Sequence, residues 1–349
     1  MAQQRQGSGP QPSRRGVVAG MAALGAGALL TPAMRGEAAP AGAHRRIDVH
    51  HHFVPDEVVG STHIVRPLKD WSVERSLDDM AKGGVTTAML SFTPQILDAL
   101  ANGGPVTPAH FRRGNEFGAK LVADHPGRYG LFAGIPLTDT DASLKEIDYA
   151  LGTLKADGIG LFTSYGNRWL GNRDFDPVFA ELNRRKAVVY THPTVAPCCG
   201  NLIAEVNVSE IEYGTDTSRA IASMVFTGAS QRFPDIRVIW SHGGGTIPYL
   251  IQRFTKDARI DARLAKIVPN GFMPEFERFY FDIAQIAKRA PLLALQAVAP
   301  PAHILFGTDY PYLTAAEHVD GLKQSRVFSA KELRAIDENA QGLVPRLKA

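Results

Sequence analysis

Two kinds of segment alternate along the chain from Ile47 onward: short apolar or β-branched runs, and longer stretches in which apolar residues recur every three or four positions. The short runs are typical of buried strands, and the longer stretches are typical of amphipathic helices. The predicted strands are Ile47–Phe53, Val85–Ser91, Tyr129–Leu137, Ile159–Tyr165, Ala187–Pro193, Ile236–Gly243, Phe279–Ala284 and His303–Tyr310. The helices expected between them include Ser76–Lys82, Pro108–Asp124, Ser143–Leu154, Pro177–Arg185, Ser218–Arg232 and Pro248–Ala265. This alternation predicts an α/β fold with a parallel sheet covered by helices.

The number of predicted strands favours a closed (β/α)8 barrel, the TIM barrel, which is built from eight strand–helix units. An open doubly wound sheet is the alternative, and it normally carries a glycine-rich phosphate-binding loop after its first strand. No such loop follows Ile47–Phe53, and the later Gly243–Gly245 run lacks the required spacing. We interpret that run as a flexible turn beside a site, and we predict the barrel.

Composition limits the number of domains and the kinds of partner. The chain has 349 residues, of which 44% are hydrophobic and 21% charged, so it can bury a large core. A barrel takes about 250 residues as a single unit. We therefore predict one domain over residues 46–349 rather than two. The net charge of +3 is small and scattered, and we expect no nucleic-acid partner.

Residues 1–45 predict an export signal and a linker. Arg14 and Arg15 precede an apolar run, rich in alanine and glycine, that ends near Leu30. This pattern looks like a twin-arginine signal, and the run is too short and too rich in glycine for a stable membrane span. The expected location is the periplasm or the extracellular space, or the cytoplasm if the signal is not used. A disordered basic tail is the alternative.

The two cysteines, Cys198 and Cys199, are adjacent in the sequence. Neighbouring cysteines rarely join each other because the geometry is strained, and no CxxC pattern suggests zinc. We expect them to be loop residues near a site, in preference to a redox or metal-binding pair.

Ligand-type side chains stand at the ends of four predicted strands. In a barrel, the active site lies at the carboxyl ends of the strands. The period of two places Asp48, His50 and His52 on one face of the first strand and His51 on the other. Three later strands add one candidate each, namely His192, His242 and Asp309.

Imidazoles and a carboxylate grouped in this way suit a borderline ion such as zinc, and they also accept manganese, iron or cobalt. A single histidine is better explained as a hydrogen-bonded structural residue than as a ligand. Structural histidines do not explain why four strand ends carry such residues together. We therefore predict a divalent metal site with an open position for water or substrate.

Four motifs resemble the amidohydrolase superfamily, from about Arg46 to the carboxyl end. They are Asp48-Val49-His50-His51-His52-Phe53, Thr191-His192-Pro193, Phe233-Pro234-Asp235-Ile236 leading into Ser241-His242-Gly243-Gly244-Gly245, and Gly307-Thr308-Asp309-Tyr310-Pro311. Within the superfamily, the chain looks like the branch that contains aminocarboxymuconate semialdehyde decarboxylase and the o-hydroxybenzoate decarboxylases.

The resemblance implies a role for each candidate. His50, His52, His192 and Asp309 would bind one ion, zinc in preference to manganese, and His242 would be the catalytic histidine beside it. Arg253 matches an arginine that binds the substrate carboxylate across a dimer interface, which implies a homodimer; a solvated surface charge is the equal alternative. The dinuclear members carry a bridging lysine or glutamate on strand four, and Ile159–Tyr165 has neither, so one ion is expected.

The reaction that the resemblance implies is non-oxidative decarboxylation of a small aromatic or unsaturated carboxylic acid, by a carboxy-lyase with Asp309 as proton donor. Trp71–Glu74 and Glu212–Ala220 look like the 6-methylsalicylate decarboxylases. Ser76 stands where the semialdehyde decarboxylase has a carboxylate-binding arginine, which argues against a dicarboxylate. The alternatives are a hydrolase of lactones, esters or amides in which His242 activates water, a hydratase, and a non-catalytic metal-binding protein.

Overall fold

The computed structural model describes residues 44–200 and 202–348. They form one compact unit. The predicted export signal falls outside the described residues. Among the residues described, no helix is both long enough and apolar enough to cross a membrane.

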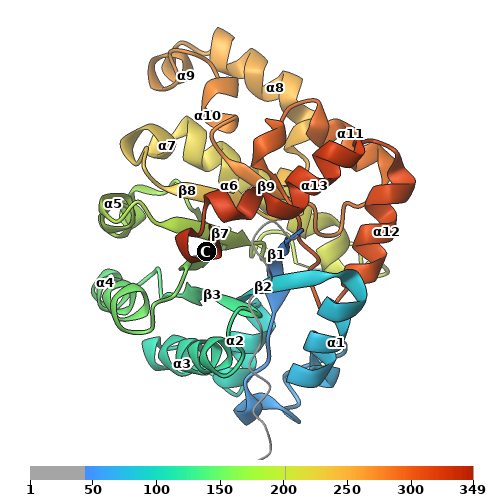
Figure 1. Cartoon of the computed structure of the whole chain (residues 1–349). Coiled ribbons are helices and arrows are strands. Elements are labelled where there is room, and N and C mark those ends of the chain that lie inside the picture. The colour runs from blue at the N-terminus through green and yellow to red at the C-terminus, as the bar shows by residue number, and fades with distance from the viewer. Residues whose placement is uncertain (1–43, 201, 349) are drawn as a thin grey trace, which may run out of the picture. The chain divides into compact units, whose positions relative to one another are not determined.

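Eight parallel strands stand in the order β1-β2-β3-β4-β7-β8-β9-β10 and form the barrel at the centre of Figure 1. They are β1 (Arg46–His52), β2 (Val85–Ser91), β3 (Tyr129–Gly134), β4 (Gly158–Phe162), β7 (Val188–His192), β8 (Arg237–Trp240), β9 (Tyr280–Asp282) and β10 (Ile304–Leu305). The Val49 amide donates to the Phe306 carbonyl and the His52 amide to the Tyr310 carbonyl, at 3.0 and 2.9 Å. These bonds join β1 to the segment after β10, so the predicted (β/α)8 barrel is confirmed.

Helices surround the strands (Figure 1). They are α1 (Val73–Gly83), α2 (Pro94–Leu100), α3 (Pro108–Asp124), α4 (Thr140–Asp148), α5 (Asp176–Arg184), α6 (Val208–Phe226), α7 (Ala229–Arg232), α8 (Ile247–Ile260), α9 (Ala262–Ile267), α10 (Met273–Phe276), α11 (Arg289–Gln296), α12 (Ala315–Ser325) and α13 (Ala330–Glu338). Neighbouring side chains cap the amino-terminal ends of several helices. At α1 the Ser72 hydroxyl accepts from the Arg75 backbone amide, and at α12 Thr314 forms a capping box with Glu317.

Two apolar clusters hold the barrel together. One fills the space between strands and helices, and the other lies inside the barrel, where the Phe132 and Tyr190 rings stack at 5.3 Å. Leu343 and Leu347, near the carboxyl terminus, belong to the inner cluster together with Ile47 and Val188 at the starts of their strands. The end of the chain therefore covers the amino-terminal end of the barrel, opposite the predicted site.

The element boundaries differ from the prediction mainly next to the site. Ile159–Tyr165 was predicted as one strand, but β4 ends at Phe162, and the short strands β5 (Ser164–Tyr165) and β6 (Arg168–Trp169) pair as a hairpin after it. The helix predicted from Ser218 begins ten residues earlier at Val208, because the Asn207 side chain accepts from the Ser209 amide and caps it.

The glycine turn and the cysteine pair also differ from expectation. Gly243–Gly245 is a packed turn with positive φ throughout; a Cβ on Gly245 would stand 2.1 Å from the Gly214 carbonyl oxygen of α6. Close approach, and not flexibility alone, therefore requires glycine there. Cys198 and Cys199 were expected to be unpaired, and the structure joins them in a disulfide.

Candidate metal centre and active site

Four of the predicted residues converge at the carboxyl ends of the barrel strands. The nearest ligand atoms of His50, His52, His192 and Asp309 all lie within 4.8 Å of one another, and all four residues are buried. His50 and His52 come from β1, and His192 ends β7. Asp309 follows β10, and its amide donates to the His50 carbonyl at 2.8 Å, which fixes the loop to β1.

The hydrogen bonds on the outer side of each imidazole determine which nitrogen faces inward. Nδ1 of His50 lies 3.0 Å from Oδ2 of Asp282, Nδ1 of His52 lies 3.2 Å from the Ser91 carbonyl, and Nδ1 of His192 lies 2.8 Å from the Pro193 carbonyl. These partners accept hydrogen bonds, so each Nδ1 carries the proton and donates. Each Nε2 is therefore the nitrogen that can present a lone pair to a metal.

The ligand atoms that face the centre lie so close together that a cation between them is the simplest explanation. The Nε2 atoms of His50 and His52 are 3.2 Å apart, and Oδ1 of Asp309 lies 3.1 and 2.9 Å from them. Acceptor lone pairs that point at one another repel unless a positive charge lies between them. Three imidazole nitrogens and one carboxylate oxygen, with the imidazoles held from behind, fit a divalent metal.

Burial and charge set the protonation of the metal-free site. Burial lowers the pKa of His52 and of His242, and it places the pKa of His192 well below its usual value. Burial also acts on His50, but the charges of Asp309 and Asp282 outweigh it and raise the pKa of His50 to about 10. His52 and His192 are therefore neutral candidate ligands and His242 is a neutral neighbour, whereas His50 holds a proton that a metal must displace.

His242 stands beside the four ligands. Its Nδ1 donates to the Ala284 carbonyl at 3.1 Å, and its ring centroid is 5.1 Å from that of His50. Its buried Nε2 has no hydrogen-bond partner among the residues that the structure describes. A buried imidazole with a free lone pair that faces the centre can accept a proton from a substrate or from water.

One segment that the sequence did not single out organises this centre. Asp282, the last residue of β9, accepts from His50 through Oδ2, and its Oδ1 accepts from the amides of His242 and Ala284 at 2.9 and 3.0 Å. Gln285 donates through Nε2 to Oδ2 of Asp309 at 3.0 Å. A buried aspartate at a strand end was the available signal for Asp282, whereas nothing in the sequence marked Gln285.

The backbone is unusual at the same places. His242, Gln285 and Asp309 have φ values of 52°, 61° and 64°, in the left-handed region that non-glycine residues seldom adopt. Such conformations cost energy and concentrate at functional sites. The backbone N–H of Gln285 donates to Nε2 of His318 at 3.1 Å, and this bond helps to hold the Gln285 backbone in its conformation.

Asp48 does not join the ligands, although strict alternation places it on their face. Its Oδ2 accepts from Nδ1 of His51 and from the Thr308 hydroxyl, at 3.0 and 2.6 Å. The register of β1 against β2 shifts between Asp48 and His51, and this irregularity breaks the period of two. His51 faces away from the ligands as expected, and its Nε2 lies 2.8 Å from the Ser76 hydroxyl.

Arg253 lies apart from the centre. It is exposed on α8, and no hydrogen bond or ion pair joins its side chain to another residue in the described part of the chain. Tyr249, one turn earlier on the same helix, is 87% exposed. The structure of a single chain therefore leaves Arg253 on the surface and does not bring it to the four ligands.

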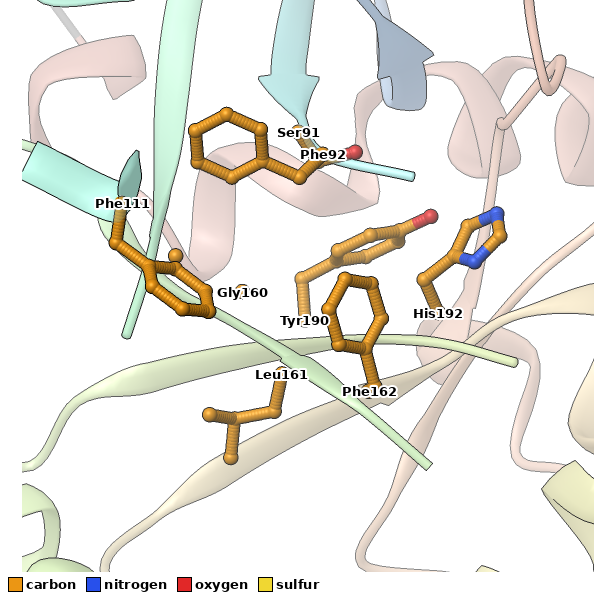
Figure 2. Close-up of a pocket in the computed structure, with 9 residues that line it drawn as sticks. Ser91, Phe92, Phe111, Gly160, Leu161, Phe162, Tyr190 and His192 are labelled. Carbon is orange, nitrogen blue, oxygen red and sulfur yellow. The ribbon is translucent and has the colours of Figure 1, made fainter. Parts of the chain in front are cut away.

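Aromatic side chains surround the centre. The half-buried rings of Tyr213 and Tyr312 lie 5.8 Å from His192 and 6.2 Å from His52. A small cavity beside His192 is lined by Ser91, Phe92, Phe111, Gly134, Gly160, Leu161, Phe162 and Tyr190 (Figure 2). These surroundings suit a small aromatic ligand.

Comparisons with known proteins agree with this geometry. The amidohydrolase family profile matches residues 47–341. Decarboxylase macB of Penicillium terrestre is 37% identical over 76% of this chain and 84% of its own length. The 6-methylsalicylic acid decarboxylase of Penicillium expansum is 36% identical over 87% of this chain and 97% of its own.

A solved structure shares the fold. A dihydroxybenzoic acid decarboxylase from a Polaromonas species, with bound manganese and an inhibitor, superposes with a TM-score of 0.73 at 20% identity, over 88% of this chain and 98% of the other. The chain therefore belongs to the amidohydrolase family, in the branch that includes the 6-methylsalicylic acid decarboxylases.

Proposed function

We propose that this protein is a metal-dependent decarboxylase that releases carbon dioxide from an ortho-hydroxybenzoate of the salicylate type. The observation that carries the proposal is its similarity, along almost the whole of both chains, to a 6-methylsalicylic acid decarboxylase. Because relatives of this similarity are decarboxylases, the chain is a carboxy-lyase of small aromatic acids and not a hydrolase.

The proposed ion is zinc or manganese. Three imidazole nitrogens and one carboxylate oxygen favour zinc, and the manganese of the Polaromonas structure supports the second choice. A divalent ion held by these four residues would supply positive charge to attract the carboxylate and phenolate oxygens of the substrate and to polarise the ring. His50, His52 and His192 keep their inward lone pairs because their outer nitrogens are occupied.

Decarboxylation exchanges a carbon–carbon bond for a carbon–hydrogen bond. The ring carbon that bears the carboxylate takes a proton, and the electron pair of the broken bond returns to the ring as carbon dioxide leaves. Asp309 is the proposed donor, with its second oxygen held by Gln285. Although burial opposes ionisation, the charge of His50 keeps the pKa of Asp309 well below its usual range. Asp309 must therefore take up a proton when the substrate binds, and the phenol is the available source.

The test is carbon dioxide release from salicylate-type acids by metal-loaded protein, with lactones assayed in parallel. We expect carbon dioxide from at least one acid, and we expect Asp309→Asn to abolish turnover while elemental analysis still finds the metal. Ring opening of a lactone without any carbon dioxide release would overturn the proposal in favour of a hydrolase.

We also propose a homodimer and export by the twin-arginine route. The exposed Tyr249 and Arg253 on one side of α8 support the first proposal, since an arginine whose side chain has no partner among the described residues, beside an exposed aromatic ring, suits an interface. Light scattering on wild type and Arg253→Ala tests it. Arg14 and Arg15 before the apolar run support the second, and fractionation of cells that express an Arg14→Lys, Arg15→Lys double variant tests that.

A further inference from the structure

The Asp216 carboxylate is fully buried in α6, and no basic side chain in the described part of the chain forms an ion pair with it. Its oxygens accept instead from the Thr163 hydroxyl, from the Ser164 hydroxyl at 2.9 Å and from the indole Nε1 of Trp169 at 2.7 Å. Burial of a carboxylate costs free energy even when hydrogen bonds offset most of it. A carboxylate at this position therefore indicates a role beyond packing.

The three donors lie on the segment that follows β4. Thr163 and Ser164 come directly after that strand, and Trp169 lies in β6. The backbone N–H of Thr163 donates to the His192 carbonyl at 3.0 Å. Asp216 therefore ties α6 to the point where the end of β4 meets His192.

The Thr163 hydroxyl also holds a peptide group that supports His192. The N–H of Thr194 donates to Oγ1 of Thr163 at 3.2 Å. The C=O of the same peptide group belongs to Pro193 and accepts from Nδ1 of His192 at 2.8 Å. Because a peptide group is planar, a bond that fixes its N–H also fixes the direction of its C=O. Since Thr163 accepts from Thr194, its own proton is available for Asp216.

We propose that Asp216 is a positioning residue for the metal ligand His192, and that it acts through Thr163 and the peptide group between Pro193 and Thr194. The carboxylate orients the hydroxyl, the hydroxyl holds the peptide N–H, and the peptide carbonyl holds the imidazole with Nε2 toward the centre. The inference rests on the metal site of the proposed function but not on its reaction.

The expected effect is a loss of metal affinity. Removal of the partner that orients a metal-bound histidine typically costs 10- to 100-fold in affinity. Asp216 lies two hydrogen bonds beyond the Pro193 carbonyl, so we expect about 10-fold, the lower end of that range.

Asp216→Asn tests the proposal without a change in size. If the amide oxygen faces the Trp169 N–H, the NH2 group faces the two hydroxyls, and Thr163 loses its acceptor. If the amide is reversed, its NH2 group meets the indole N–H. Metal affinity measured by chelator competition should fall about 10-fold, and the visible spectrum of the cobalt-loaded protein should change because His192 is reoriented.

The double variant Trp169→Phe, Asp216→Asn separates positioning from packing. Phenylalanine has no N–H, so the amide can turn its oxygen to the two hydroxyls, and the affinity should return to that of Trp169→Phe alone. Independent losses of packing would add instead. A double variant that binds metal more weakly than both single variants would therefore overturn the proposal.

Thr163→Val and Thr163→Ser form a matched pair, because valine removes the hydroxyl at nearly the same size and serine keeps it. Only the valine variant should lose affinity, and Asp320→Asn on the exposed side of α12 should behave like wild type. Wild-type affinity in both Asp216→Asn and Thr163→Val would refute the positioning role. These measurements need no turnover, so they remain decisive if no acid releases carbon dioxide and the proposed function fails.

Discussion

Replacement of Asp282 by asparagine tests whether the carboxylate at the end of β9 holds the metal centre. The carboxylate accepts from Nδ1 of His50 through one oxygen and from the amides of His242 and Ala284 through the other. An asparagine of the same size can keep the two amide bonds, but its NH2 group then faces Nδ1 of His50 and cannot accept. The His50 proton would move to Nε2, the atom that should bind the metal.

The size of the effect follows from this single lost acceptor. Loss of the partner that orients a metal-bound histidine typically costs 10- to 100-fold in metal affinity or activity, which is roughly 1.4 to 2.7 kcal/mol. Chelator competition measures the affinity, and carbon dioxide release at saturating metal measures the activity. Asp320→Asn on the exposed side of α12 is the matched control and should bind metal like wild type. An Asp282→Asn protein with wild-type affinity and turnover would refute the reasoning.

Three further predictions follow from the same centre. His242→Asn should lower kcat at least 100-fold with the metal content unchanged, because its free Nε2 is not among the four ligands; loss of metal in this variant would make His242 a ligand. Gln285→Ala should lower kcat about 10-fold by releasing Oδ2 of Asp309, with little change in KM, and Gln285→Glu should not restore it, because a second carboxylate repels Asp309. Metal binding should release about one proton below pH 10, because His50, whose pKa is raised to about 10, is protonated in the metal-free protein. Apparent metal affinity should then rise about tenfold per pH unit toward pH 10, and calorimetry in buffers of different ionisation enthalpy that finds no proton release would contradict this.

The sequence was most informative where the chain is regular. Val85–Ser91 and Pro108–Asp124 were predicted with the bounds that the structure has, because β-branched runs and helical periodicity report burial directly. The prediction was poorest at the last strand, where His303–Tyr310 was expected and β10 covers only Ile304–Leu305. Beyond Leu305 the chain turns to carry Asp309 at positive φ, and hydropathy does not encode such a turn.

The site residues also divide into those that the sequence predicted and those that it did not. His50, His52, His192 and Asp309 could be predicted because parallel strands bring their carboxyl ends together, so strand-end position implies proximity. Asp282 and Gln285 could not, because their roles depend on hydrogen bonds to side chains from other strands. Strict alternation along β1 also placed Asp48 on the same face as His50 and His52. That placement was wrong, because a single register shift moves a side chain to the other face of a strand.

The way in which the imidazoles are supported explains why Asp282 is the sensitive position. His52, His192 and His242 donate to the backbone carbonyls of Ser91, Pro193 and Ala284, and no side-chain substitution removes a carbonyl. Nδ1 of His52 also lies 3.2 Å from the Ser91 hydroxyl, but His50 alone among these four histidines depends directly on a charged side chain. When a carboxylate, and not a carbonyl, accepts the hydrogen bond from Nδ1, the Nε2 atom of the same imidazole becomes a stronger electron donor to the metal. Asp282 therefore sets the basicity of one ligand without touching the ion, and a change at this single position alters the metal affinity while the barrel keeps every other ligand in place.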